Sequence, residues 1–281
     1  SEINILHGDI RDSGFVTSSL SGVEVVYHLA ALISIPYSYQ APSSYMRTNV
    51  EGTLNVLQSC LDNEVSRLIH TSTSECYGTA QYVPINESHP LVAQSPYSAS
   101  KISADQFCLS YFKSFGLPVS ILRPFNTYGP RQSVRAVIPS IITQVLNGND
   151  VISLGSLTPT RDFNFVLDTC AAFTAVAESN ASIGKVLNSA SNFEISIGQL
   201  VELIASIISR DIEIVEESRR TRPGQSEVFR LYGDNSLLRG LTNWSPIYGG
   251  LDGFRLGLER TIEWFSIPSN LSFYSPSTFL T

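Results

Sequence analysis

The sequence predicts an α/β fold in which a doubly wound parallel sheet carries a smaller C-terminal α/β lobe. Two observations lead to this prediction. Short, continuously apolar segments recur through the first two thirds of the chain, as expected of parallel strands buried on both faces. Longer segments with apolar residues at helical spacing lie between them. Strand–helix–strand alternation of this kind builds a parallel sheet covered by helices.

Four apolar segments are the predicted buried strands: residues 3–6 (INIL), 23–31 (VEVVYHLAA), 67–72 (RLIHTS) and 119–124 (VSILRP). Two segments between them, 42–61 and 97–115, are predicted to be helices because their apolar residues recur every three or four positions. Asn49 and Glu51 interrupt the apolar face of the first helix, so each is either functional or merely exposed.

The pattern is looser after residue 125. Helices are predicted near 137–147, 168–178, 196–209 and 250–265, and strands near 151–154, 163–166 and 185–189. We therefore predict two domains. Residues 1–125 with 163–190 form a dinucleotide-binding domain, and residues 126–162 with 191–281 form a smaller lobe against its carboxyl strand edges.

The composition limits the classes of protein to which this chain can belong. A chain of 281 residues with 43% hydrophobic residues can bury a sizeable core. The net charge of -7 argues against a nucleic-acid surface, so a bound anion would need locally placed arginines. No segment is typical of a membrane span or a signal peptide, which favours a cytoplasmic location. The spacing of the four cysteines and four histidines predicts buried free thiols and no metal site.

Tyr97 and Lys101 in SPYSASK are four residues apart near a predicted helix start, which places both side chains on one helix face. An ammonium beside a phenol stabilises the phenolate. Working near neutrality would require the tyrosine pKa to fall by roughly 3 units, or about 4 kcal/mol. A Tyr-x-x-x-Lys pair also arises by chance, so its position after the segment TSTSECYG carries the argument.

Glu75 lies in that segment, among hydroxyl side chains where a buried strand should end. It is either a solvated loop residue or a base directed into a cleft. The small residues of YHLAA, at the end of another predicted strand, are either ordinary core or a place where a planar cofactor approaches the backbone. Asp9 in HGDIRD is either a helix cap or a contact to an adenosine.

Four arginines lie in segments that also contain Gly, Pro or Thr: Arg131, Arg135, Arg161 and Arg222. Guanidinium groups that converge on a cleft would bind a diphosphate in bidentate fashion. The alternative is a surface arginine paired with a nearby carboxylate, as Arg161 with Asp162, and this alternative is favoured more for Arg135 than for the others.

Taken together, these segments resemble the extended short-chain dehydrogenase/reductase family, in particular its nucleotide-sugar epimerases and 4,6-dehydratases. The resembling motifs are GDIRD, YHLAA, TNVEGTLNVL, TSTSECYG, SPYSASK, RPFNTYGPRQ, RDFNFV and RPGQSEV, and they cover almost the whole chain. The legionaminic-acid type of UDP-N-acetylglucosamine 4,6-dehydratase is the most similar group. The resemblance implies a Rossmann-like sheet, a nucleotide-sugar-binding C-terminal lobe and a homodimer through helices 42–61 and 97–115.

The resemblance also implies roles for individual residues. The catalytic residues would be Thr73, Ser74, Glu75, Tyr97 and Lys101. The contacts to NAD would come from Asp9, Ile10, Leu29, Ala30, Ala31, Asn49, Ser72, Tyr97, Lys101 and Pro124. The contacts to the nucleotide-diphosphate sugar would come from Thr73, Asn126, Arg131, Arg161 and Arg222. Glu75 favours dehydration, because epimerases that do not dehydrate typically lack this carboxylate. Ser74 replaces the aspartate of glucose-type dehydratases, which leaves the acid that protonates the departing hydroxyl open.

The favoured hypothesis is an NAD-dependent lyase that converts UDP-N-acetylglucosamine to its 4-keto-6-deoxy derivative. A nucleotide-sugar 4-epimerase and a dehydratase of the GDP-mannose or dTDP-glucose type are the alternatives within enzymes. A catalytically silent dinucleotide-fold binding protein, or an inactive fragment, is the alternative of another class.

One expected motif is absent from the sequence. The resembling family begins with a strand and a glycine-rich turn (GxxGxxG) that bind the pyrophosphate, and the printed residues contain no such turn. We therefore expect a sequence that lacks its first βαβ unit, exposes apolar strand edges and binds NAD weakly. Tight binding in an isothermal titration would contradict this expectation. NADP stays open as an alternative cofactor, because the residues that select it follow the second strand.

Overall fold

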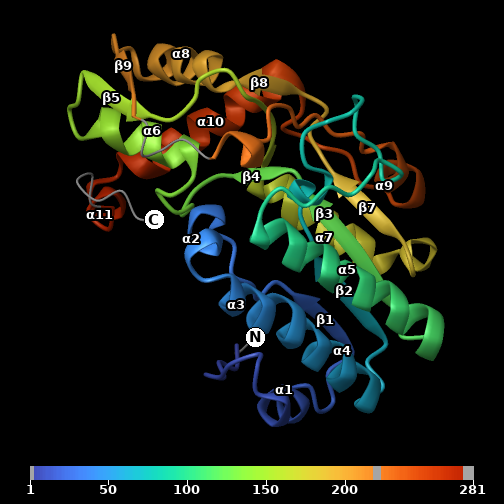
Figure 1. Ribbon diagram of the computed structural model, residues 1–281. Coiled ribbons are helices and arrows are strands. Elements are labelled where there is room, and N and C mark those ends of the chain that lie inside the picture. The colour runs from blue at the N-terminus through green and yellow to red at the C-terminus, as the bar shows by residue number, and fades with distance from the viewer. Residues whose placement is uncertain (1–2, 218–222, 275–281) are drawn as a thin grey trace.

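The main sheet is formed by four parallel strands. A computed structural model describes residues 3–217 and 223–274 of the chain (Figure 1). The strands lie in the order β1 (Val25–His28), β2 (Arg67–Thr71), β3 (Val119–Pro124) and β7 (Val186–Ser189). The predicted fold class is confirmed, and the three predicted strands that end near residues 28, 71 and 124 are present.

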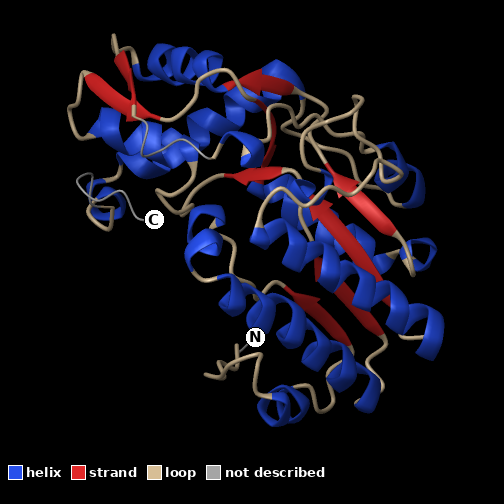
Figure 2. Ribbon diagram, viewed as in Figure 1, coloured by secondary structure: helices blue, strands red, loops and turns tan. Residues whose placement is uncertain are grey.

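Helices cover both faces of this sheet (Figure 2). One face packs against α1 (Ser13–Ser19), α4 (Gly52–Asp62) and α5 (Pro96–Phe115), and the other packs against α7 (Val166–Glu178) and α9 (Ser236–Leu241). Successive strand residues point to opposite faces. Leu68 therefore belongs to the first core and its neighbour Ile69 to the second. Burial on both faces explains the continuously apolar strand segments.

Residues 3–6 do not form the predicted strand. Ile3 is 85% exposed and Ile5 is 72% exposed. A parallel strand needs a neighbour that accepts and donates its backbone hydrogen bonds, and β1 pairs with β2 but with no other strand among the described residues. The prediction is wrong for these residues because an apolar segment cannot supply its own pairing partner.

The predicted helix at 42–61 is continuous but changes its winding. It consists of α3 (Pro42–Tyr45), a π-helical segment (Met46–Glu51) and α4. Asn49 lies inside the π-helical segment. Short π-helical insertions shift the helix face that a side chain points to, and they are frequent at functional sites.

Local sequence explains both ends of α5. The Ser95 hydroxyl accepts a hydrogen bond from the Ser98 backbone N–H, and the Ser98 side chain bonds the backbone N–H of Ser95 in return. Pro96 occupies the first turn, where its missing N–H is not needed. Gly116 ends the helix in the left-handed region, with φ of 73°. The helix start that carries Tyr97 is thus fixed by its own sequence.

The C-terminal lobe has two small sheets and its own core. Strands β4 (Asn126–Tyr128), β6 (Thr160–Phe165) and β8 (Glu194–Ser196) form one sheet, and β5 (Val151–Leu154) pairs with β9 (Glu213–Glu216). The helices of the lobe are α6 (Val137–Leu146), α8 (Ile197–Ile208), α10 (Gly250–Ser266) and α11 (Pro268–Leu271). An aromatic cluster of Tyr128, Phe163, Phe165 and Phe254 fills the core. The predicted strand at 163–166 is the second half of β6, which starts at Thr160.

Shorter elements complete the fold. Helix α2 (Ile35–Gln40) precedes α3, and within the described residues 3₁₀ turns span Ser74–Tyr77, Asn180–Ser182 and Gly224–Ser226. In Figure 1, α2 lies at the side of the main domain that faces the C-terminal lobe. The domain boundaries stay a prediction. Within the described ranges no helix has the length and apolar character that crossing a bilayer requires.

Candidate active site

The carboxyl end of β2 places a buried carboxylate beside a hydroxyl. The strand ends at Thr71, and Thr73 begins the 3₁₀ turn Ser74–Tyr77, where its hydroxyl accepts a 3.2 Å hydrogen bond from the Glu75 backbone N–H. Thr73 and Ser74 are buried, and Glu75 is only 9% exposed. Glu75 is therefore not a solvated loop residue. A carboxylate held inside the protein can act as an acid or a base.

Tyr97 meets this segment from the first turn of α5. It is 8% exposed, and its ring lies 6.2 Å from the ring of Tyr45. Burial raises the pKa of the Tyr97 phenol, a hydrogen bond with Thr73 lowers it, and the charge of Glu75 raises it again. The net pKa lies above the ordinary value. The protein alone does not supply the lower pKa that work near neutrality would require, because burial disfavours the phenolate.

Lys101 lies one turn further along α5 and is buried. Its Nζ donates a 2.6 Å hydrogen bond to the carbonyl of Thr71 at the end of β2. Burial lowers the pKa of the ammonium, whereas the charge of Asp105 raises it. An ammonium has three N–H donors, and one of them has a partner among the described residues. Two donors are available for the hydroxyl groups of a bound molecule.

The residues predicted to contact a cofactor fall into two groups. Leu29 and Ala30 are exposed and Ala31 is half-buried, just after the carboxyl end of β1. Parallel sheets bind nucleotides outside this end of their strands. Ser72 is buried, whereas Ile10 and Pro124 are half-buried. Only Leu29 and Ala30 are exposed among these positions, and the contacts of all of them to a cofactor stay a prediction.

Asn49 and Asp9, which are also predicted to contact a cofactor, have protein partners. The Asn49 amide bonds the backbone N–H and carbonyl of Leu32 and donates to the Ser100 hydroxyl. Asn49 therefore connects the loop after β1 to α5 through hydrogen bonds. Asp9 is exposed and pairs with Arg11, whose hydrogen bond lowers the Asp9 pKa to about 2. Asp9 is not a helix cap, because Asp12 caps α1.

The arginines predicted to bind a diphosphate differ in burial and in their partners. Arg161 is buried and lies 3.2 Å from a carboxylate oxygen of Glu227, and its partner is not Asp162, which accepts hydrogen bonds from Ser191. Arg131 is exposed, with φ of 68° in the left-handed region. Arg135 is also exposed, yet its charge acts on Tyr45. Arg222 lies outside the described residues, and Asn126 is half-buried where β4 starts.

Sequence reasoning missed a buried charged cluster beneath the site. Asp105 on α5 pairs with Arg123 on β3 and lies 3.5 Å from His70 on β2. The available signals were an acid four residues after Lys101 and two polar residues inside apolar strand segments. Such residues are almost never fully buried unless they are paired, so each implied a partner.

The cysteines depart from the prediction at one position. All four are free thiols, and Cys60, Cys76 and Cys108 are buried, but Cys170 is exposed. Cys170 lies on α7, which packs one face against the sheet and exposes the opposite face to solvent. Cys170 is on the exposed face. In the described part of the chain, no three His, Cys, Asp or Glu side chains gather in a way that could hold a metal ion.

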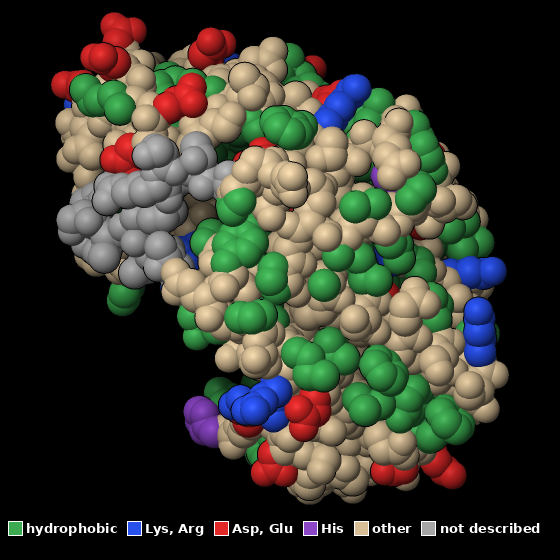
Figure 3. Space-filling view, viewed as in Figure 1, with side chains coloured by type: hydrophobic (Ala, Val, Ile, Leu, Met, Phe, Trp, Pro, Cys, Tyr) green, Lys and Arg blue, Asp and Glu red, His purple; other side chains and the backbone are tan. Residues whose placement is uncertain are grey.

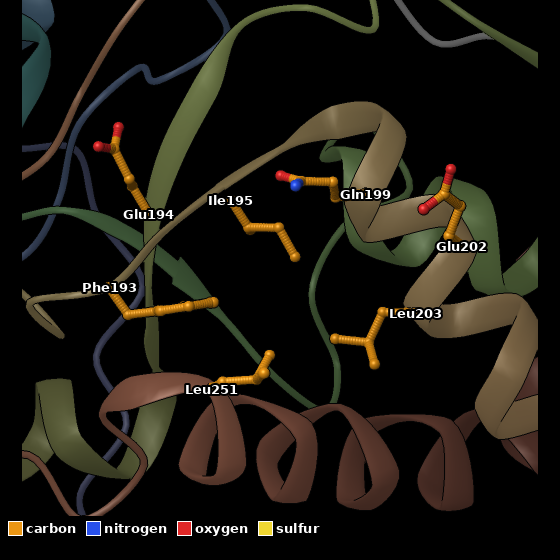
Figure 4. A pocket seen from close by; sticks show the side chains of 7 residues that line it. All are labelled: Phe193, Glu194, Ile195, Gln199, Glu202, Leu203 and Leu251. Carbon is orange, nitrogen blue, oxygen red and sulfur yellow. The ribbon is translucent and has the colours of Figure 1, made fainter.

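A separate open groove lies in the C-terminal lobe, between β8, α8 and the start of α10 (Figure 4). The side chains that line it are Phe193, Glu194, Ile195, Gln199, Glu202, Leu203 and Leu251. Phe193, Leu203 and Leu251 point into it. None of the predicted site residues lines this groove, so it is distinct from the site at the end of β2.

Comparisons with known proteins identify the family and the fold. The chain matches the family model described as GDP-mannose 4,6 dehydratase over residues 1–255. The low-salt glycan biosynthesis protein Agl12 of Haloferax volcanii is 31% identical over 263 residues, which cover 92% of this chain and 81% of that protein.

Two solved structures have similar folds. DesIV, a dTDP-glucose 4,6-dehydratase from Streptomyces venezuelae solved as a double mutant with NAD and DAU bound, has a TM-score of 0.86 and 28% identity, covering 96% of this chain and 81% of its own. A UDP-N-acetylglucosamine 4-epimerase from Methanobrevibacter ruminantium, in complex with UDP-N-acetylmuramic acid, has a TM-score of 0.83 and 32% identity, covering 93% and 82%.

Proposed function

This chain belongs to the family of nucleotide-sugar 4,6-dehydratases and epimerases that the GDP-mannose 4,6 dehydratase model describes, and from that premise we propose that it is an NAD-dependent 4,6-dehydratase of a UDP-hexose. UDP-N-acetylglucosamine is the favoured substrate. The observation that carries the proposal is the buried Glu75 carboxylate, whose charge acts on the Tyr97 phenol. Dehydration removes two different protons from one hexose ring, that of the 4-hydroxyl and that at C5. A phenol and a carboxylate base can take one each.

The residues at the carboxyl edge of the sheet fit a dinucleotide. The buried Lys101 ammonium has two N–H donors to spare for ribose hydroxyls. The small side chains of Ala30 and Ala31 leave the end of β1 open to a flat ring. Bound NAD would supply the acceptor of the hydride from C4 and the donor of the hydride to C6. Its cationic nicotinamide would also favour the phenolate that burial disfavours.

The side chains then have separate tasks at the sugar. Tyr97 takes the proton of the 4-hydroxyl, and Thr73 bonds the same oxygen. The resulting ketone acidifies the hydrogen at C5, which Glu75 removes as a general base. Water leaves from C6 with the proton that Glu75 took from C5. Once hydride has been added at C6, C5 takes a proton back from the Tyr97 phenol or from solvent, so that only water is lost. Asn126, Arg131, Arg161 and Arg222 are proposed to hold the diphosphate.

The product of the reaction tests the proposal. The intact gene product that contains this sequence is incubated with NAD and UDP-N-acetylglucosamine, and the product is analysed by mass spectrometry and by its absorbance in alkali. We expect the loss of one water and a 4-keto-6-deoxy sugar. A product of unchanged mass that is inverted at C4 would establish the epimerase instead, and dTDP-glucose and GDP-mannose run in parallel decide the nucleotide and the sugar.

We also propose a homodimer through α4 and α5. The two helices lie side by side on one face of the sheet, and Figure 3 shows hydrophobic side chains gathered over them. Phe107 and Phe115 of α5 are large and exposed. Buried aromatic residues dominate the free energy of association at interfaces.

Sedimentation velocity tests the dimer. We expect the wild type to sediment as a dimer at micromolar concentration, and Phe107→Asp to shift it to the monomer, because a charge would be buried without a partner. Phe273→Asp, at an exposed position outside both helices, is the matched control and should leave the dimer intact. A monomeric wild type would contradict the proposal.

A further inference from the structure

A buried carboxylate lies directly behind the predicted catalytic residues. Asp105 on α5 has no exposed surface. Its Oδ2 accepts hydrogen bonds from the Ser72 hydroxyl at 2.8 Å and from the Arg123 guanidinium at 2.8 and 3.1 Å. Its Oδ1 lies 3.5 Å from Nε2 of His70. An isolated ionised carboxylate is too costly to bury, so this arrangement must stabilise its charge.

The charge of the Asp105 carboxylate favours the charged form of Lys101. The other titratable groups coupled to this ammonium are Cys76, Cys108, His28 and His70. Tyr97 lies one turn before Lys101 on α5, and Glu75 lies in the 3₁₀ turn that contacts this helix. Burial raises the pKa of both thiols and lowers the pKa of both histidines, to about 4 for His70, so these four are neutral at pH 7. Arg123 is a cation that pairs with Asp105. Burial would raise the pKa of Asp105, but His70, Arg123 and Lys101 outweigh it and the pKa lies below its ordinary value.

Asp105 also fixes the end of β2 through Ser72. Thr71, just before Ser72, offers the carbonyl that accepts the hydrogen bond from Lys101. Thr73, just after Ser72, contacts Tyr97 and begins the turn that carries Glu75. The Asp105 carboxylate therefore restrains Ser72. This residue lies between Thr71, which bonds Lys101, and Thr73, which bonds Tyr97.

We propose that Asp105 is a positioning residue, which keeps the buried Lys101 ammonium charged and holds the strand end that presents Thr73 and Glu75. This inference extends the proposed function. Only the expected effect of Asp105 on catalysis rests on that function. The electrostatic part can be tested without turnover, because it concerns the protonation of Lys101 itself.

The test is an NMR titration of lysine side chains labelled with ¹³C at Cε in the 281-residue chain. The chain has three lysines, Lys101, Lys113 and Lys185, and the last two are exposed. Arginine substitutions at Lys113 and Lys185 assign the signals. In Asp105→Asn we expect the midpoint of Lys101 to fall by about one pH unit or more, since a nearby opposite charge shifts a pKa by that order. The midpoints of Lys113 and Lys185 should stay unchanged and serve as internal controls.

Two further variants complete the test. One addresses misfolding of Asp105→Asn, and the other is a control that keeps the Asp105 charge. Asp105→Asn leaves Arg123 buried without its carboxylate, which is strongly destabilising. The double variant Asp105→Asn with Arg123→Gln removes the guanidinium that would be left without a partner, and we still expect the Lys101 midpoint to fall, because this ammonium stays buried without the nearby carboxylate. Ser72→Ala is the matched control: it removes one hydrogen bond, keeps the charge, and should leave the Lys101 midpoint at the wild-type value.

The wild type provides a readout that needs no substitution. The Asp105 carboxyl carbon should titrate below the ordinary range of aspartate. A titration above that range would show a neutral acid and overturn the proposal. An unchanged Lys101 midpoint in any folded Asp105 variant would also overturn it. Failure of the proposed function would appear in the product analysis and would leave these titrations unaffected.

Discussion

The variant Glu75→Gln should lose dehydration by a factor of about 10² to 10⁴, which is the usual contribution of a positioned general base. Glutamine keeps the size and shape of the side chain but cannot take the proton from C5. Oxidation at C4 does not require the Glu75 carboxylate, so we expect reduced cofactor to accumulate in one turnover without loss of water. Stopped-flow absorbance of the reduced nicotinamide, together with product analysis, measures both effects.

Two controls isolate the carboxylate of Glu75. Glu51→Gln changes an exposed glutamate in the same way and should leave turnover at the wild-type rate. Exchange of the C5 hydrogen with deuterated solvent should disappear in Glu75→Gln and persist in the control. Dehydration at the wild-type rate in folded Glu75→Gln would reject this residue as the base.

Replacing Tyr97 by phenylalanine should reduce turnover by a similar factor of about 10² to 10⁴. The 4-hydroxyl then has no acceptor for its proton, so the reaction should stop before any hydride leaves C4. Tyr97→Phe should therefore show no reduced cofactor, whereas Glu75→Gln accumulates it. The variant should stay folded, because the lost hydrogen bond with Thr73 contributes only about 1 kcal/mol.

The matched control for Tyr97→Phe is Tyr111→Phe. Tyr111 is a buried tyrosine of the same helix whose hydroxyl bonds Gln58 rather than the site. We expect Tyr111→Phe to retain wild-type turnover and a small loss of stability in denaturant titrations. Formation of reduced cofactor at the wild-type rate in Tyr97→Phe would contradict the assigned role.

Predictions from the sequence succeeded where the controlling interactions are local. The bounds of α5 follow from Ser95, Pro96 and Gly116, which cap the helix within a few residues of its ends. The strand 119–124 was predicted with its observed limits, because a segment buried on both faces is apolar throughout. The placement of Tyr97 and Lys101 on one face of α5 follows from the helical period alone.

Predictions failed where a distant partner decides the outcome. Residues 3–6 have the composition of a strand but no neighbouring strand in the described fold. Arg161 is paired with Glu227, sixty-six positions further along the chain, and not with the adjacent Asp162. The spacing of Tyr97 and Lys101 gave no measure of burial, and burial among residues from other elements raises the Tyr97 pKa.

The sequence by itself determined the α/β class, the helix that carries Tyr97 and Lys101, and the presence of an acid where a buried strand ends. All of these depend on residue type and spacing within a single segment. Only the tertiary structure decided that Glu75 is buried beside Tyr97 and that Asp105, Arg123 and His70 form one charged cluster. The reason is physical: burial and charge pairing depend on distances between segments, which exist only once the strands have assembled into a sheet.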